Sequence, residues 1–148
     1  MSAIVRQAGL TDLDAIAPLF DAYRQFYGQA SNPALARAFI AERLGVLESV
    51  ILVAENGDSA VVGFTQLYPS FSSVSARRIW ILNDLFVTPA ARGQSVAHAL
   101  LAAARAHAIA TGAKRLVLST ARDNPAQALY ESLGYERDAA YYHYSLEL

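Results

Sequence analysis

The chain has 148 residues, of which 54% are hydrophobic and 17% charged, and this size and composition predict one globular domain spanning residues 1–148. Its 12 basic and 13 acidic side chains nearly balance, which argues against binding to nucleic acid or an anionic membrane, and the absence of cysteine excludes disulfides, thiolate metal sites and cysteine nucleophiles. No apolar stretch reaches the ~18 residues of a membrane-spanning helix and the N-terminus shows no secretion signal, so we expect a cytoplasmic protein.

The first third of the chain predicts a short strand followed by two helices. The apolar, β-branched run at 3–7 is typical of a strand. Thr11 and Asp14 fit a capping box for a first helix, whose apolar residues recur at helical spacing and in which Pro18 predicts a kink. Asn32, which precedes a proline, is expected to cap a second helix.

The next part of the chain changes to strand patterns. The runs at 50–55 and 60–67 are rich in β-prone residues. They are joined through Asn56-Gly57, a dipeptide suited to positive backbone angles, and so predict an antiparallel hairpin. A proline and four serines between 69 and 75 indicate a surface loop.

The second half predicts a strand, helix and strand in succession, followed by a short helix and a last strand. A long strand is expected at 77–87, an Ala- and Leu-rich helix at 96–110 and a strand at 115–120, which is the order of a right-handed crossover. Asn124 is expected to cap the short helix. The segment 141–148 alternates between apolar and polar residues as a strand does, and its tyrosines and leucines on a sheet edge predict a homodimer.

The turn that leads from the strand at 77–87 into the following helix is suited to an anion. The first turn of a helix presents backbone N–H groups without internal partners, and small residues let a phosphate approach them. Arg92 adds a planar charged group, so a pyrophosphate would fit. An ordinary turn with Ser95 as helix cap is the alternative, and spacing alone favours neither. A nucleotide-hydrolysing P-loop is excluded because the only lysine is Lys114.

Two segments of the chain carry longer motifs. One is Arg92-Gly93-Gln94-Ser95-Val96-Ala97, which follows a strand that ends Asn83-Asp84-Leu85-Phe86-Val87, and the other reads NPAQALYESLGY from Asn124 to Tyr135. The first resembles the acyl-CoA loop R/Q-x-x-G-x-G/A of the GNAT family of N-acetyltransferases, except that Ser95 stands where the family usually has glycine. The second resembles that family's N-x-x-A-x-x-L-Y-x-x-x-G-F/Y signature, with one residue fewer between Asn124 and Leu129. The order of elements also matches, so the resemblance covers essentially the whole chain.

The resemblance implies a fold, a co-substrate and its contacts. The fold is a single α/β domain, in which a mixed, mostly antiparallel sheet carries a central strand-helix-strand acyl-CoA-binding unit and helices on both faces. The co-substrate is acetyl-CoA, and no metal is expected, because the histidines lack metal-ligand spacing. The residues implied to contact coenzyme A lie on the strand end, the loop and the later motif: Leu85, Phe86, Val87, Arg92, Gly93, Gln94, Ser95, Val96, Ala97, Asn124 and Tyr130.

Three residues are implied to act in acetyl transfer. Tyr130 is expected to protonate the departing thiolate, since a phenol pKa of ~10 lies close to the ~8.5 of a thiol. The backbone N–H of Val87 is the expected donor to the developing oxyanion, and Asp84 is the candidate base for the amine. The structural alternatives are core packing for Tyr130 and helix capping for Asn124.

Asp84 is expected to share a strand face with Trp80, Leu82 and Phe86, where a carboxylate without a partner is costly. An ion pair with Arg77 or Arg78 is therefore the structural alternative. The stretch Asn83-Asp84-Leu85-Phe86-Val87 resembles the Glu-Asp-Phe-Phe-Val of spermidine/spermine acetyltransferases, whose acids hold a cationic amine. Asn83 replaces the glutamate, so polyamine specificity does not follow.

The sequence thus predicts transfer of an acetyl group from acetyl-CoA directly to a primary amine of a small molecule. Tyr27, Asn83 and Asp84 are the expected substrate contacts, with Phe26, Tyr68 and Tyr142 as further candidates for the pocket wall. Two alternatives stay open: a catalytically silent acyl-CoA-binding regulatory module, and a protein or peptide N-acetyltransferase.

Overall fold

The structure is a computed structural model that describes residues 3–148. The chain divides into two compact units, one ending at Leu118 and the other comprising Ser119–Leu148, and each is described by itself. The first unit contains a five-stranded sheet with its strands in chain order. Neighbouring strands are antiparallel from the first to the fourth, and the last pair is parallel. The strands are β1 (Ile4–Gln7), β2 (Val50–Glu55), β3 (Val61–Ser72), β4 (Arg77–Val87) and β5 (Leu116–Val117).

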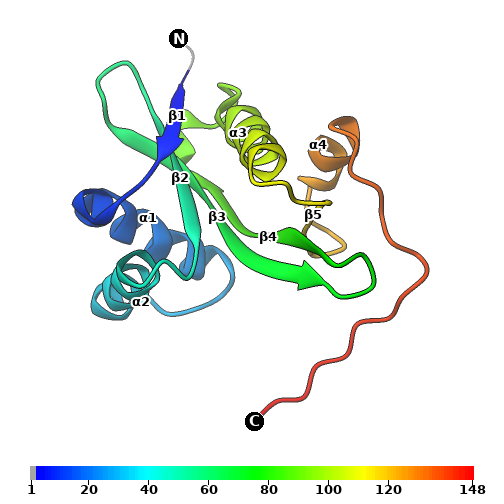
Figure 1. Ribbon diagram of the computed structural model, residues 1–148. Coiled ribbons are helices and arrows are strands. Elements are labelled where there is room, and N and C mark those ends of the chain that lie inside the picture. The colour runs from blue at the N-terminus through cyan, green and yellow to red at the C-terminus, as the bar shows by residue number, and fades with distance from the viewer. Residues whose placement is uncertain (1–2) are drawn as a thin grey trace. The chain divides into compact units, whose positions relative to one another are not determined.

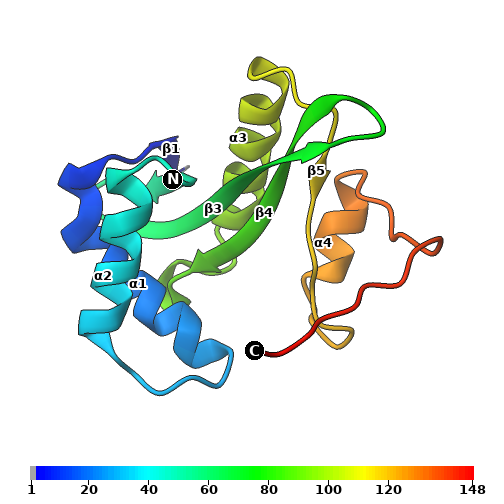
Figure 2. The ribbon, with the colours of Figure 1, turned by 60° about the horizontal axis from the view of Figure 1, so that its bottom comes forward.

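Helices cover both faces of this sheet. Two of them, α1 (Leu13–Phe26) and α2 (Pro33–Gly45), pack on one face, and α3 (Val96–Ala110) lies on the other (Figures 1 and 2). Short 3-10 turns, Leu10–Asp12 and Pro89–Ala91, precede α1 and follow β4. No helix within residues 3–148 has both the length and the apolar character needed to cross a membrane. The mixed sheet with helices on both faces confirms the expected fold class.

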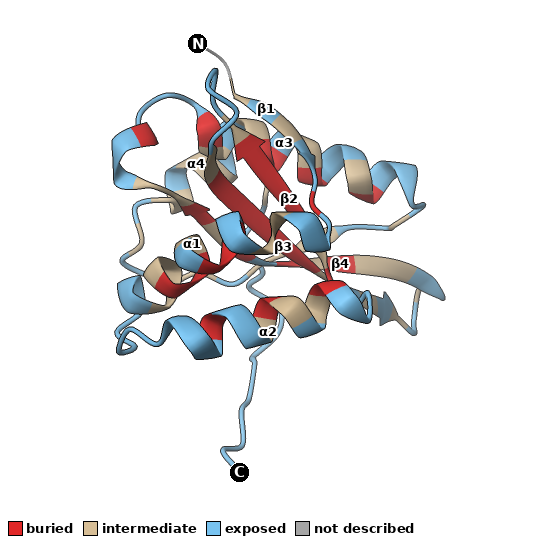
Figure 3. Cartoon of the chain, turned by 90° about the vertical axis from the view of Figure 1, so that its left-hand side faces the viewer, coloured by how far each residue is buried: buried red, intermediate tan, exposed pale blue. Residues whose placement is uncertain are grey.

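The core lies between the sheet and the α1/α2 layer, where a cluster of apolar side chains is almost fully buried. Figure 3 shows the buried positions concentrated on β2 and β3 and on the helix sides that face them. The most deeply buried members of the cluster are Ile16, Ile40, Ile51, Val53 and Phe64. Burying such side chains supplies the main driving force for folding.

One register shift in β4 changes which face its side chains take. Gln66 of β3 pairs with Asp84, whereas the next residue of β3, Leu67, pairs with Leu82. Asn83 is therefore an extra residue in β4, which is the definition of a β-bulge. Because side chains alternate along a strand, this single extra residue reverses the alternation beyond it.

The bulge places Asp84 on the face opposite to that of Leu82. Phe86 belongs with Asp84 on the α1/α2 side, where it joins the core cluster. Trp80 belongs with Leu82 on the other side, and its ring lies 4.9 Å from that of His107 in α3. The expectation that Asp84 shares a face with Trp80 and Leu82 is therefore wrong, because simple alternation does not reveal a bulge.

Several predicted element boundaries are confirmed. The strands β2 and β4 and the helix α3 have the predicted bounds 50–55, 77–87 and 96–110. The Asn32 Oδ1 accepts the Leu35 N–H at 3.1 Å, so Asn32 caps α2 as expected. The start of the first helix differs from the prediction: the Gly9 N–H donates to the Asp12 carboxylate at 2.9 Å, in place of a cap by Thr11. The helix α1 continues through its proline.

The hairpin and the loop that follows it also differ from expectation. The positive φ of the turn falls on Ser59, at 60°, rather than on the predicted glycine, and the Asn56 Oδ1 accepts two turn N–H groups at 3.0 Å. β3 continues to Ser72, so the predicted loop begins later. Pro69 is tolerated in this extension because β2 ends opposite Leu67, which leaves no ladder bond for the missing proline N–H to make.

The two predicted C-terminal strands are shorter or absent. Only Leu116–Val117 of the predicted 115–120 strand pairs with β4. Within Ser119–Leu148 the structure contains the helix α4 (Gln127–Ser132) and no strand, so the prediction for 141–148 is wrong. Alternation indicates which side chains share a face, but a strand also needs a neighbour for its backbone groups.

Candidate active site

Asp84 is a buried carboxylate held by amides. Its side chain accepts hydrogen bonds from the Gln66 Nε2 on one oxygen and, at 2.8 Å, from the Asn83 Nδ2 on the other. The Ser49 hydroxyl donates to the Gln66 Oε1 at 2.8 Å and so fixes the orientation of that amide. Only 3% of Asp84 is exposed. The bulge at Asn83 therefore presents an acid on the apolar α1/α2 face and supplies one of its donors.

No cation neutralises this carboxylate within residues 3–148. Arg77 donates to a backbone carbonyl at 3.2 Å, and the guanidinium of Arg78 lies 5.2 Å from the Trp80 ring centroid. The predicted structural ion pair with either arginine is therefore wrong. Because the bulge moves Asp84 to the other face of the sheet, it separates the acid from the side of β4 that carries Trp80.

Burial changes the pKa of Asp84 and those of the two tyrosines near it. It raises the pKa of the Asp84 carboxyl, although hydrogen bonds from Gln66, Asn83 and Tyr23 oppose the shift. Burial and the nearby carboxylate also raise the pKa of Tyr23 and that of Tyr68, the latter to about 12. Both phenols thus keep their protons at neutral pH, while Asp84 can accept a proton at a higher pH than an ordinary aspartate.

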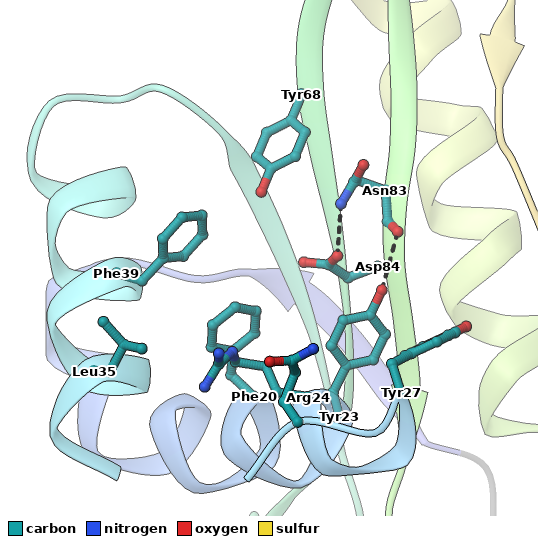
Figure 4. Close-up of a pocket in the computed structure, with 10 residues that line it drawn as sticks. Phe20, Tyr23, Arg24, Tyr27, Leu35, Phe39, Tyr68, Asn83 and Asp84 are labelled. Carbon is teal, nitrogen blue, oxygen red and sulfur yellow. Dashed lines mark hydrogen bonds between the residues drawn. The ribbon is translucent and has the colours of Figure 1, made fainter. Parts of the chain in front are cut away.

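A cavity of about 440 Å³ opens beside Asp84 (Figure 4). Aromatic rings from α1, from the residue just after it, from α2 and from β3 form most of its wall: Phe20, Tyr23, Tyr27, Phe39 and Tyr68. Polar and charged side chains complete it, together with Leu35: Arg24, Gln29, Asn83 and Asp84. An apolar cavity with a few convergent polar groups is typical of a small-molecule site.

The structure brings all three predicted substrate contacts, Tyr27, Asn83 and Asp84, to this cavity, together with Tyr68. Phe26 does not line it and is 63% exposed. The sequence analysis missed the roles of Phe20, Tyr23, Arg24 and Phe39 in the wall. The spacing of Phe20, Tyr23 and Tyr27 was a usable signal, since it places three rings on one helix face, but it also fits core packing.

The N-terminus of α3 presents backbone donors that the helix does not use. The Ala99 N–H donates to the Ser95 carbonyl at 3.1 Å as the first helical bond, so the N–H groups of Val96, Ala97 and His98 have no partner within the helix. Ser95 stands at the cap position with φ of 63°, and its hydroxyl makes no capping bond. Ser95 therefore occupies the predicted cap position, but the side-chain cap of the alternative interpretation does not form.

The loop before α3 is tied to the end of β4. The Arg92 Nε donates to the Val87 carbonyl at 3.0 Å, and the guanidinium lies 5.7 Å from the Phe86 ring centroid. Gly93 has φ of 76°, and a Cβ added there would meet no atom within 4 Å, so there is open space beside this backbone. Unpaired N–H groups, a guanidinium and an open approach together fit a diphosphate.

The end of β4 presents a free backbone edge on the side away from β3. The Thr88 N–H donates to the Val62 carbonyl at 2.9 Å, so by strand alternation the N–H of Val87 points away from β3. On that side β4 pairs with β5 only at Trp80 and Ile81 within the first unit. Apart from the Val87 carbonyl, which accepts the Arg92 Nε, the edge at Leu85–Val87 has no partner within the first unit and is suited to an extended ligand that adds as a strand does.

The second unit carries the remaining predicted residues. Tyr130 lies in α4, with its ring centroid 5.9 Å from that of Tyr135. The Asn124 Oδ1 accepts the Ala126 N–H at 2.9 Å in the turn before α4, whose cap position is Ala126, so the expectation that Asn124 caps the helix itself is wrong. The structure describes this unit separately from the first, so the association of Tyr130 and Asn124 with the loop stays a prediction. Tyr142, also in this unit, is 89% exposed.

Comparison with known proteins gives consistent matches along the chain. A model of the acetyltransferase (GNAT) family matches residues 16–135. The chain is 53% identical over 146 residues to the uncharacterized N-acetyltransferase YhfO of Bacillus subtilis (strain 168), covering 97% of each chain. It is 34% identical over 125 residues to a probable acetyltransferase of Haemophilus influenzae, covering 84% of each. A crystal structure of a probable acetyltransferase matches with a TM-score of 0.93 and 46% identity, over 98% of this chain and 97% of that one.

Proposed function

Since the chain belongs to the acetyltransferase (GNAT) family, whose members use acetyl-CoA as co-substrate, we propose that it transfers an acetyl group directly to a primary amine of a small molecule. The observation that carries the proposal is Asp84, a buried carboxylate at the wall of an aromatic cavity with no ion-pair partner among residues 3–148. Such a carboxylate attracts an ammonium group, and aromatic rings around it stabilise the cation further.

Asp84 takes the proton of the bound ammonium and leaves the neutral amine that the reaction needs. The raised pKa of Asp84 suits this role, because it brings the acidity of the carboxyl closer to that of an ammonium group. Tyr23 and Tyr68 keep their protons and can orient the amine by hydrogen bonding.

The backbone N–H of Val87 stabilises the developing oxyanion, and Tyr130 holds a proton for the departing sulfur. Acetyl-CoA, when bound, supplies the thioester carbonyl that the amine attacks. Arg92 and the N–H groups from Gly93 to Ala97 would hold its diphosphate, and the edge at Leu85–Val87 would pair with its pantetheine arm. The open backbone edge and the unused helix donors support these contacts.

The experiment that tests this proposal measures thiol release from acetyl-CoA with a panel of small amines, for the wild type and Tyr130→Phe. We expect the substitution to lower turnover by about 10²-fold, because it removes the proton donor, with little change in coenzyme A affinity measured by calorimetry. Tyr141→Phe, at an exposed position of the same unit, is the control.

Unchanged turnover in Tyr130→Phe would remove Tyr130 from the mechanism. Coenzyme A binding without thiol release from any amine would instead support a silent acyl-CoA-binding module. Release with peptides alone would indicate a peptide acetyltransferase.

We further propose that residues 1–148 act as one domain in the cytoplasm and that two copies associate through the C-terminal segment. Without cysteine the fold does not depend on disulfides, so it is compatible with a reducing compartment. The exposed apolar side chains of Tyr142, Tyr144 and Leu146 support an association, although they do not lie on a strand.

A further inference from the structure

Arg24 gives the cavity a positive charge in addition to the negative charge of Asp84. It lies on α1 one turn after Phe20, and its side chain lines the cavity (Figure 4). Within residues 3–148 the guanidinium makes no ion pair, and its Nη1 is buried without a hydrogen-bond partner. A buried guanidinium nitrogen without an acceptor is costly, and residues 3–148 supply none, which leaves this guanidinium suited to an oxygen acceptor from a ligand.

The nearest acid on the same helix is already satisfied by other donors. Asp21 accepts hydrogen bonds from the Ser31 hydroxyl at 2.7 Å, the Asn32 N–H at 2.8 Å and the Gln25 amide at 3.1 Å. These bonds tie the loop after α1 to the helix. Like these bonds, the charge of Arg24 lowers the pKa of Asp21, so the two groups attract one another, but the oxygens of Asp21 are taken by these three bonds and the Arg24 Nη1 has no acceptor.

We propose that the acceptor is an α-amino acid with an aromatic or large apolar side chain, an inference that rests on the proposed function. The amine lies at Asp84, the carboxylate at Arg24, and the side chain against the rings of Phe20, Tyr23 and Phe39. A guanidinium pairs with a carboxylate through two parallel hydrogen bonds, which fixes the orientation of the molecule as well as its charge.

The same pair of charges disfavours other classes of amine. A polyamine would bring a second cation toward Arg24, where like charges repel. The N-terminus of a peptide has no α-carboxylate and would leave Arg24 unpaired. A zwitterion, by contrast, complements both charges of the cavity at once.

Three acceptors that share one ring and one amine test this proposal by thiol release: L-phenylalanine, phenethylamine and L-phenylalaninamide. Only the first carries a carboxylate, and we expect its kcat/KM to be at least about tenfold the highest of the other two, as one charge-assisted pair would give. We expect Arg24→Gln to lower kcat/KM for phenylalanine at least about tenfold more than for phenethylamine, mainly through KM. Arg37→Gln, which removes an exposed arginine of α2, is the matched control.

A binding measurement isolates the carboxylate from the chemistry. We expect 3-phenylpropionate, which has no amine, to bind the wild type in calorimetry and to bind Arg24→Gln at least about tenfold more weakly. Equal use of phenylalanine and phenethylamine by the wild type would overturn the proposal while leaving the acetyltransferase intact. A preference for phenylalaninamide would overturn it in favour of a peptide N-terminus. If no amine releases thiol, the proposed function fails, and the phenylpropionate measurement still decides the role of Arg24.

Discussion

Asp84 is ionisable but has only neutral groups as hydrogen-bond partners. Amides of Gln66 and Asn83 hold its two oxygens, and burial raises its pKa. Folding therefore favours the protonated carboxyl, so the native state binds more protons than the unfolded state between the ordinary and the raised pKa. This contribution to stability is fully present below the unfolded pKa of ~3.9, and it is lost as the pH rises through the folded pKa.

We predict that Asp84→Asn removes this pH dependence. In urea unfolding at a series of pH values, the free energy of unfolding of the wild type should fall relative to that of the variant as the pH rises above about 4. Asp58→Asn, in the exposed β2–β3 turn, is the control. Parallel curves for wild type and Asp84→Asn would mean that burial does not disfavour the charged carboxyl.

At the level of elements, β3 and α3 approach so closely that only glycine fits between them. A Cβ on Gly63 would lie 2.9 Å from the Phe86 carbonyl oxygen, 3.2 Å from the Val96 Cγ1 and 3.3 Å from the Leu100 Cδ1. The first of these atoms belongs to the backbone and cannot rotate away. Gly63 thereby lets the start of α3, which carries the unused donors, pack directly on the sheet.

We predict that Gly63→Ala destabilises the protein by about 1–3 kcal/mol, because the added methyl group forces α3 away from β3. Urea unfolding measures the change. Gly45→Ala is the control, since a Cβ at that position would have no atom within 4 Å. A loss below ~0.5 kcal/mol for Gly63→Ala would show that the contact relaxes without cost.

The sequence predicted elements well where one signal dominated and missed features that depend on pairing. The helix α3 and the strand β4 have their predicted bounds because a long Ala- and Leu-rich run and a β-branched run have no competing interpretation. The bulge at Asn83 was missed because it exists only relative to the register of β3. Arg24 was missed because an arginine on an amphipathic helix most often faces solvent, and only tertiary packing buries its Nη1.

At the level of the whole molecule, binding of coenzyme A should stabilise the folded state. A ligand at 100 times its dissociation constant contributes about 2.7 kcal/mol, which corresponds to a rise in Tm of roughly 5–10 °C. We predict that coenzyme A raises Tm in thermal melts and that pantetheine, which lacks the diphosphate, raises it much less. Arg92→Gln should reduce the shift with coenzyme A, and added salt should weaken it. Equal Tm shifts from coenzyme A and pantetheine would mean that the diphosphate loop contributes nothing to the affinity.

The bulge also lets β4 place buried side chains in opposite layers at positions two apart in the sequence. Before Asn83, the buried side chains of Trp80 and Leu82 lie on the α3 side of the sheet. After it, those of Asp84 and Phe86 lie on the side covered by α1 and α2. Substitutions at Asp84 or Phe86 therefore act on the cavity side of the sheet, whereas substitutions at Trp80 or Leu82 act on the α3 side. Deleting Asn83 would leave a regular strand in which Leu82 and Asp84 keep their opposite faces, so the acid would stay in its layer and lose only the Asn83 amide donor.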